Sequence, residues 1–129
     1  MPYLEPKEAN NRLIDSLADI KTRNGPPPWR EPVLATERFR MVLLCWPPGY
    51  HHPRHYHPRA DESWLIYEGQ VRVIFDDGTT VVADPGSVLF AKKGTVHDMT
   101  VTSKESLLLV AIVAPNEPDD EVKLPLEEE

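Results

Sequence analysis

The sequence predicts an all-β domain, a β-sandwich or a small barrel, preceded by one helix. From residue 31 onward the apolar residues recur with a period of two, which is the spacing of side chains on one face of a strand. Turn sequences at 76–78, 84–86 and 92–94 keep the strands short. The chain also has 14 prolines, about twice the usual frequency of roughly 5%. These features favour many short strands joined by turns over a helix bundle or a parallel α/β fold.

The single helical pattern precedes the strands. Residues 5–22 carry apolar side chains on one face at a spacing of 3.6 residues, namely Leu13, Ile14, Leu17 and Ile20. The sequence NGPPPW at 24–29 then ends the helix and predicts an extended connector. The strands are expected near residues 32–36, 39–46, 55–57, 62–67, 70–75, 79–83, 87–91, 97–102 and 106–114.

The length of 129 residues predicts one domain. We assign the helix and the proline-rich connector to residues 1–30, the β-barrel to 31–115 and an acidic tail to 116–129. From residue 117 to the end there are seven acidic residues and one lysine, which accounts for most of the net charge of −7. We expect this tail to be solvated and frayed; the alternative is an acidic interaction segment.

Composition also excludes several classes of function. The sequence has no basic stripe for nucleic acid or for an anionic membrane surface. The longest apolar run, residues 107–114, is too short to cross a bilayer, and we expect no secretory signal at the N-terminus. Cys45 is the one cysteine, so no internal disulfide forms, and its apolar neighbours predict an inert core thiol. We therefore expect a cytoplasmic protein.

Four of the five histidines fall between residues 51 and 57, directly before an expected strand. His55 and His57 are two positions apart, so on a strand their rings project from one face about 6–7 Å apart and can converge on one ion. Glu62 follows after a turn that can return its carboxylate to this face. His97 begins a later strand, which a closed barrel can bring to the same interior.

The other two histidines of this group, His51 and His52, precede Pro53, whose fixed φ interrupts strand pairing. We expect both in a solvated loop that approaches the site, and not among the ligands of an ion. Two histidines separated by one residue are a weak signal by themselves, because many exposed strands match that pattern.

The wider spacing of these residues resembles the first sequence motif of the cupin family. That motif reads glycine, five residues, His-x-His, three or four residues, glutamate, six residues and glycine. Every fixed position is matched, by Gly49, His55, His57, Glu62 and Gly69.

The second cupin motif is matched in part. Gly86, Gly94 and His97 stand at the required spacing, whereas Lys92 replaces the proline of the motif and Val101 its terminal asparagine. The resemblance covers residues 49–101 directly and is typical of small single-domain cupins.

The resemblance implies a double-stranded β-helix, the jelly-roll barrel, with one divalent transition metal per chain bound by His55, His57, Glu62 and His97. Three imidazoles and one carboxylate suit Fe(II), which we favour, and also Mn(II), Ni(II), Zn(II) and Cu(II). On an octahedral ion these ligands leave two positions open for water, substrate or dioxygen. A tetrahedral zinc ion leaves none, and the site is then structural.

We favour a metal-dependent enzyme, an Fe(II) dioxygenase, that acts on a small organic molecule. The alternatives are a lyase, isomerase or decarboxylase of the same fold, and a non-catalytic module that senses a small ligand or a metal. Arg40 can present its guanidinium to a carboxylate substrate, and the candidate apolar walls of the pocket include Trp64, Phe90 and Met99.

The sequence also predicts a homodimer. The runs MVLLCW at 41–46 and LLLVAIVA at 107–114 are apolar on both faces of a strand, which is more apolar surface than one core requires. The N-terminal helix can cover one such face. We expect the remaining surface to pair with a second copy about a two-fold axis.

Overall fold

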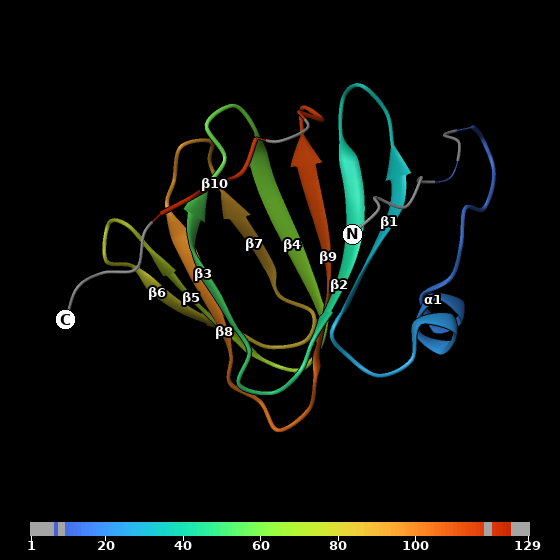
Figure 1. Cartoon of the computed structure of the whole chain (residues 1–129), viewed down its shortest axis with the longest axis horizontal. Helices are drawn as coiled ribbons and strands as arrows, with labels where there is room; N and C mark the ends of the chain where they lie inside the picture. Colours follow the sequence, from blue (N-terminus) through green and yellow to red (C-terminus); the bar gives the residue numbers. More distant parts are fainter. Residues whose placement is uncertain (1–6, 8–9, 118–119, 125–129) are drawn as a thin grey trace.

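The computed structural model describes Lys7, residues 10–117 and residues 120–124. In this part of the chain ten strands form two antiparallel five-stranded sheets, and one short helix lies beside them (Figure 1). The helix is α1 (Leu17–Asn24). The strands are β1 (Trp29–Ala35), β2 (Arg40–Trp46), β3 (His51–Tyr56), β4 (Asp61–Glu68), β5 (Val71–Phe75), β6 (Thr80–Ala83), β7 (Val88–Ala91), β8 (His97–Val101), β9 (Leu107–Ala114) and β10 (Val122–Lys123).

The two sheets enclose the core, and this arrangement confirms the predicted all-β fold. One sheet has the order β1-β2-β9-β4-β7 and the other the order β10-β3-β8-β5-β6, so many neighbours come from distant parts of the chain. Side chains alternate between the core and the outside along β4, β5, β7 and β8. In β4, for example, Trp64 and Ile66 are buried while Leu65 and Tyr67 are exposed.

Strands β2 and β9 are largely covered on both faces, which explains their continuous apolar sequences. Leu109 packs into the core between the sheets, whereas Leu43 and Leu108 pack on the other side with Ile20 of α1. Figure 1 shows α1 outside the barrel, beside β1 and β2. Cys45 is buried in this second cluster, and burial raises the pKa of its thiol, in keeping with the prediction of a core residue.

Among the described residues the helix begins only at Leu17, so it is shorter than the predicted range of residues 5–22. Ser16 is the N-cap, with an extended backbone and a side chain that accepts a hydrogen bond from the Asp19 amide at 3.2 Å. Upstream, Asp15 is paired with Lys7, which itself forms a backbone bridge to β1. These contacts with distant residues override the local helical pattern. Residues 5–6 and 8–9 of the predicted helix lie outside the described residues. No helix in the described part is long and apolar enough to span a membrane.

The described part of the C-terminal tail is ordered against the barrel, which corrects the prediction that the tail is frayed. β10 pairs with β3, with Val122 opposite Tyr56 and Lys123 opposite His55. Asp120 is 1% exposed, and its carboxylate accepts hydrogen bonds from the amide and the Nε of Arg59, both at 3.1 Å. A carboxylate that is paired in this way tolerates burial, so an acidic composition does not by itself keep the segment in solvent.

The outer face of β4 and β7 is apolar and exposed in the described part of the chain. Leu65 and Tyr67 of β4 are 37% and 47% exposed, and Val88 and Phe90 of β7 are 74% and 58% exposed. The two strands are paired, so these side chains form one surface. Phe90 was expected in the pocket, and this prediction is wrong, because the buried positions of β7 belong to the other parity, that of Leu89.

Candidate metal site

The barrel interior brings together His55, His57, Glu62 and His97, the four side chains proposed as ligands from the sequence. His55 on β3 and His97 on β8 are direct partners in the register of the two strands. Glu62 lies on β4 of the opposite sheet, and His57 follows β3 immediately. All four residues are buried, with exposed fractions between 1% and 8%.

The ligand atoms of His55, His57 and Glu62 lie close enough to share one ion, and His97 borders this group. The Nε2 of His57 is 3.1 Å from Oε1 of Glu62, and the Nε2 of His97 is 3.7 Å from the same oxygen. One ring nitrogen each of His55 and His57 and one carboxylate oxygen of Glu62 lie within 4.8 Å of one another. The ring of His97 is next to that of His55, with centroids 4.3 Å apart.

Two of the imidazoles are held in one orientation by the backbone. His55 Nδ1 lies 2.8 Å from the carbonyl oxygen of Pro53, and His97 Nδ1 lies 3.1 Å from that of Thr95. Because a carbonyl oxygen only accepts, each Nδ1 carries the hydrogen and donates it. The Nε2 of each ring is then left with a free lone pair, which is the arrangement found for histidines that bind metals.

Three buried polar atoms of this group lack a hydrogen-bond partner among the described residues: His57 Nδ1, Glu62 Oε1 and His97 Nε2. A buried acceptor without a partner costs about 1–3 kcal/mol, and more if it is charged. Although Glu62 Oε1 is near His57 Nε2, the contact does not have the geometry of a hydrogen bond. A cation between the rings and the carboxylate would satisfy Glu62 Oε1 and His97 Nε2 and would face the Nε2 of His57, so the residues present fit a divalent metal.

The pKa values of two of the rings shift in opposite directions, although the Glu62 carboxylate raises both. Burial lowers the pKa of His57, but Glu62 more than offsets this, so the pKa lies above its usual value. For His97, burial and then the neighbouring His55 ring lower the pKa, despite the opposing effect of Glu62. His97 is therefore kept in the neutral form, the form of imidazole that binds metals.

The turn before His97 is well defined although Lys92 replaces the proline of the second motif. The Thr95 amide donates to the carbonyl of Lys92 at 3.0 Å, and the Gly94 amide donates to the carbonyl of His57 at 2.8 Å. Gly94 has a φ of 81°, the left-handed region that glycine adopts without strain. Hydrogen bonds thus take over the role of the proline, and they also tie the His97 turn to His57.

A cavity of about 730 Å³ opens onto the buried cluster. Its lining is mostly apolar and includes Trp64 and Met99, which were both expected there. Arg40, the expected carboxylate-binding residue, also lines it. Phe90 does not, since it points to the outer face. A cavity of this size fits a small organic molecule.

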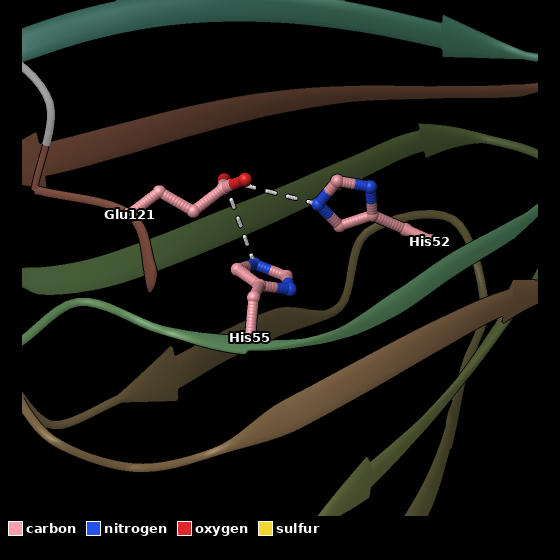
Figure 2. A group of neighbouring side chains, drawn as sticks. All are labelled: His52, His55 and Glu121. Atoms are coloured by element: carbon pink, nitrogen blue, oxygen red, sulfur yellow. Dashed lines mark ion pairs between the residues drawn. The ribbon is translucent and has the colours of Figure 1, made fainter. Parts of the chain in front are cut away.

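Sequence reasoning missed two residues of this cavity, His52 and Glu121. β3 begins at His51, so His51 and His52 lie in a strand and not in the predicted loop. The His52 ring stacks on Trp46 with centroids 5.2 Å apart, and burial and then the His55 ring lower its pKa to about 4. Figure 2 shows the Glu121 carboxylate reaching toward both rings: its Oε1 lies 3.9 Å from the Nε2 of His52 and from that of His55.

A proline within a strand often marks a β-bulge, so Pro53 was the sequence feature that could have indicated that His52 lies in a strand and faces the cavity. No local pattern signalled Glu121, because it reaches the cavity through the pairing of β10 with β3.

Comparison with known proteins identifies the family. A profile described as the cupin domain matches residues 42–113, more than half of the chain. A germin-like protein of subfamily 1 from Arabidopsis thaliana is 30% identical over 120 residues, which is 88% of this chain and 50% of that protein. The chain thus spans about half the length of this relative.

Solved structures show the same fold. An uncharacterized conserved protein with a double-stranded β-helix domain from Klebsiella pneumoniae is 25% identical with a TM-score of 0.68, over 77% of this chain and 85% of that one. A recombinant oxalate oxidase in complex with glycolate is 24% identical with a TM-score of 0.60, over 66% and 45% of the two chains. The DMSP lyase DddQ from Ruegeria pomeroyi is 22% identical with a TM-score of 0.64, over 74% and 47%. The fold therefore occurs in enzymes of different reaction types.

Proposed function

Because this chain belongs to the cupin family, we propose that it is a metal-dependent enzyme that acts on a small organic molecule. His55, His57, Glu62 and His97 would hold one divalent transition metal at the inner end of the cavity. The observation that carries this proposal is that, within the described part of the chain, the buried side-chain nitrogen and oxygen atoms without a partner all belong to these residues. We refer to these four residues as the inner site.

The donor set favours Fe(II), with Mn(II), Ni(II), Zn(II) and Cu(II) as alternatives. When bound, a metal of this class supplies Lewis acidity and, in the case of iron, redox chemistry with dioxygen. We favour a dioxygenase reaction. The oxalate oxidase among the structural neighbours is compatible with this choice, and the lyase keeps the alternative open.

The substrate class follows from the cavity wall. Arg40 Nη1 donates hydrogen bonds to Oδ1 of Asn116 at 3.2 Å and to the carbonyl of Glu117 at 3.1 Å, which hold the guanidinium in position. A guanidinium in a mostly apolar wall is suited to a carboxylate. Trp64 and Met99 would pack on the apolar part of the substrate and exclude water. A small carboxylic acid is therefore the proposed substrate.

The test begins with protein purified without oxygen and analysed for metals by mass spectrometry. We expect about one transition-metal ion per chain, and an absence of metal from folded protein would overturn the proposal. A panel of small carboxylic acids is then supplied with and without dioxygen. Consumption of dioxygen with turnover supports a dioxygenase, turnover without dioxygen identifies a lyase or isomerase, and ligand binding without turnover identifies a sensor.

Substrate recognition by Arg40 has a matched control in Arg38, which lies two residues earlier in the turn between β1 and β2. Arg40→Met is expected to raise the KM for a carboxylate substrate, or its Kd, at least about tenfold, since a charge-assisted pair is lost. The metal content should not change. Arg38→Met, at an exposed position, should leave both quantities unchanged. Equal behaviour of the two variants would remove Arg40 from the site.

We further infer that two copies of the chain pair through the outer face of β4 and β7. The centre of this face carries the exposed uncharged side chains Leu65, Tyr67, Val88 and Phe90, with the charged Asp61 and Glu68 at the two ends of β4. Helix α1 covers the neighbouring face of β1 and β2 instead. A two-fold axis places the same patch of each copy against the other, so an apolar face is complementary to itself. Burial of Phe90 and Val88 would then stabilise the dimer.

Sedimentation equilibrium at micromolar protein concentration tests the dimer. We expect a mass of twice 14.7 kDa for the natural sequence, and 14.7 kDa for Phe90→Lys, since pairing would bury the introduced charge. Val82→Lys is the control, because Val82 is 54% exposed on β6 of the other sheet and should leave the dimer intact. A monomeric natural protein would show that α1 covers enough of the apolar surface.

A further inference from the structure

We propose that His52, His55 and Glu121 form a second cation position, which takes a divalent transition metal at the mouth of the cavity. We call these three residues the outer position. It lies nearer to solvent than the inner site, because the side chains of His52 and Glu121 are 21% and 34% exposed. The inference goes beyond the proposed function, and it does not require that the inner site is occupied.

The distances fit an ion better than direct contacts. Glu121 Oε1 lies 3.9 Å from the Nε2 of His52 and from the Nε2 of His55. This separation is too long for a hydrogen bond. Two ligand atoms that each lie about 2.1 Å from one ion are at most about 4.2 Å apart, so a single ion can span both gaps. The three ligand atoms lie within 4.8 Å of one another (Figure 2).

A β-bulge turns the two histidines to the same side. In the pairing of β3 with β8, His52 lies opposite Met99 and His55 lies opposite His97, so three steps along β3 match two along β8. Strict alternation would point His52 and His55 to opposite faces of β3. The additional residue of the bulge brings both side chains to the same face. The stacking of His52 on Trp46 then fixes the ring.

Glu121 is held between two anchors. On one side, Asp120 is buried and bonded to Arg59. On the other side, β10 pairs with β3, and the Leu124 amide donates to the carbonyl of Arg54 at 3.0 Å. The Glu121 carboxylate is therefore held near His52 and His55 by a fixed backbone and not by a free tail.

His55 belongs to both positions, but it has only one free nitrogen. Its Nδ1 donates to the carbonyl of Pro53, which leaves Nε2 for a metal. One nitrogen lone pair binds one ion, so the inner site and the outer position compete for His55. The natural protein should bind a single ion through His55, and the outer position should fill when the inner site is disabled.

The experiment titrates full-length, metal-free protein with Co²⁺ in a calorimeter. In the background Glu62→Gln/His97→Gln, which disables the inner site and keeps His55, we expect one Co²⁺ per chain. Adding Glu121→Gln or His52→Gln should weaken this binding at least about tenfold, the scale typical of damage to a metal site. Adding His51→Gln is the matched control, because His51 is exposed and its Nε2 lies beside Asp98 instead, at 3.7 Å.

Loss of all Co²⁺ binding from the folded double-variant background would overturn the outer position. So would equal affinity of the Glu121, His52 and His51 variants. If the background does not give a native circular dichroism spectrum, Glu62→Gln alone serves in its place, because it removes the carboxylate of the inner site. If the inner site does not bind metal, the natural protein and the Glu62→Gln/His97→Gln background would bind Co²⁺ with the same affinity. This result would contradict the proposed function and leave the outer position standing.

Discussion

His97→Gln is expected to lower the affinity for the inner-site metal about 100-fold and to remove most of the stabilisation that metal provides. The Nε2 of His97 is buried, lacks a partner and lies 3.7 Å from Glu62. Glutamine keeps a similar size, but it lacks the imidazole lone pair. A metal that binds only the folded state stabilises it by about 2.7 kcal/mol when its free concentration is 100 times Kd.

Melting curves with and without a chelator, together with metal analysis, measure both effects. The natural protein should lose several degrees of Tm in chelator, and the His97 variant should lose little. His51→Gln is the control and should behave as the natural protein. Identical melting curves for a demonstrably metal-loaded natural protein would mean that the metal does not bind in the barrel core.

Gly69→Ala is expected to cost about 2–5 kcal/mol of the free energy of unfolding. Gly69 ends the first motif and has a φ of 79°, where a side chain costs about 1–2 kcal/mol. A Cβ at this position would also lie 2.6 Å from the carbonyl oxygen of Ser106 and 2.9 Å from the Cα of Leu107. Both are backbone atoms at the start of β9, so relief requires a backbone shift that adds about 1–3 kcal/mol.

Gly78→Ala separates the two contributions. Gly78 has a φ of 88°, but a Cβ there meets nothing within 4 Å. It should therefore cost only the backbone term of about 1–2 kcal/mol. Urea unfolding of both variants gives the comparison. Equal losses would show that β9 moves away from residue 69 without cost and that the close approach has no structural role.

Several features of this protein are predictable from the sequence because their cause is local. Period-two alternation identifies β4, β5 and β8 to within two residues, since one face of each strand meets the core. The same parity brings His55 and His57 into one interior. Glycines with positive φ fix the turns, and their spacing in the motifs supports the cupin fold that the structure has.

Other features were decided only by contacts between distant segments. The helical pattern starts at residue 5, but Asp15 pairs with Lys7 and Ser16 caps the helix. For this reason α1 begins only at Leu17. In β7, where both parities are apolar, the sequence does not say which side faces the core, and pairing with β4 turns Phe90 outward.

The candidate metal site also combines features that the sequence predicts with features that only tertiary contacts decide. The spacing of His55 and His57 predicted that both rings face the interior, because alternation along a strand is set by the geometry of the strand itself. Glu62 and His97 join them there through the packing of the two sheets and the pairing of β3 with β8. Only the tertiary structure decided that His52 faces the cavity, since a bulge depends on the partner strand and reverses the parity of every residue beyond it. Glu121 reaches His55 only because β10 pairs with β3 and Asp120 is anchored at Arg59, two long-range contacts with no counterpart in the local pattern of an acidic segment.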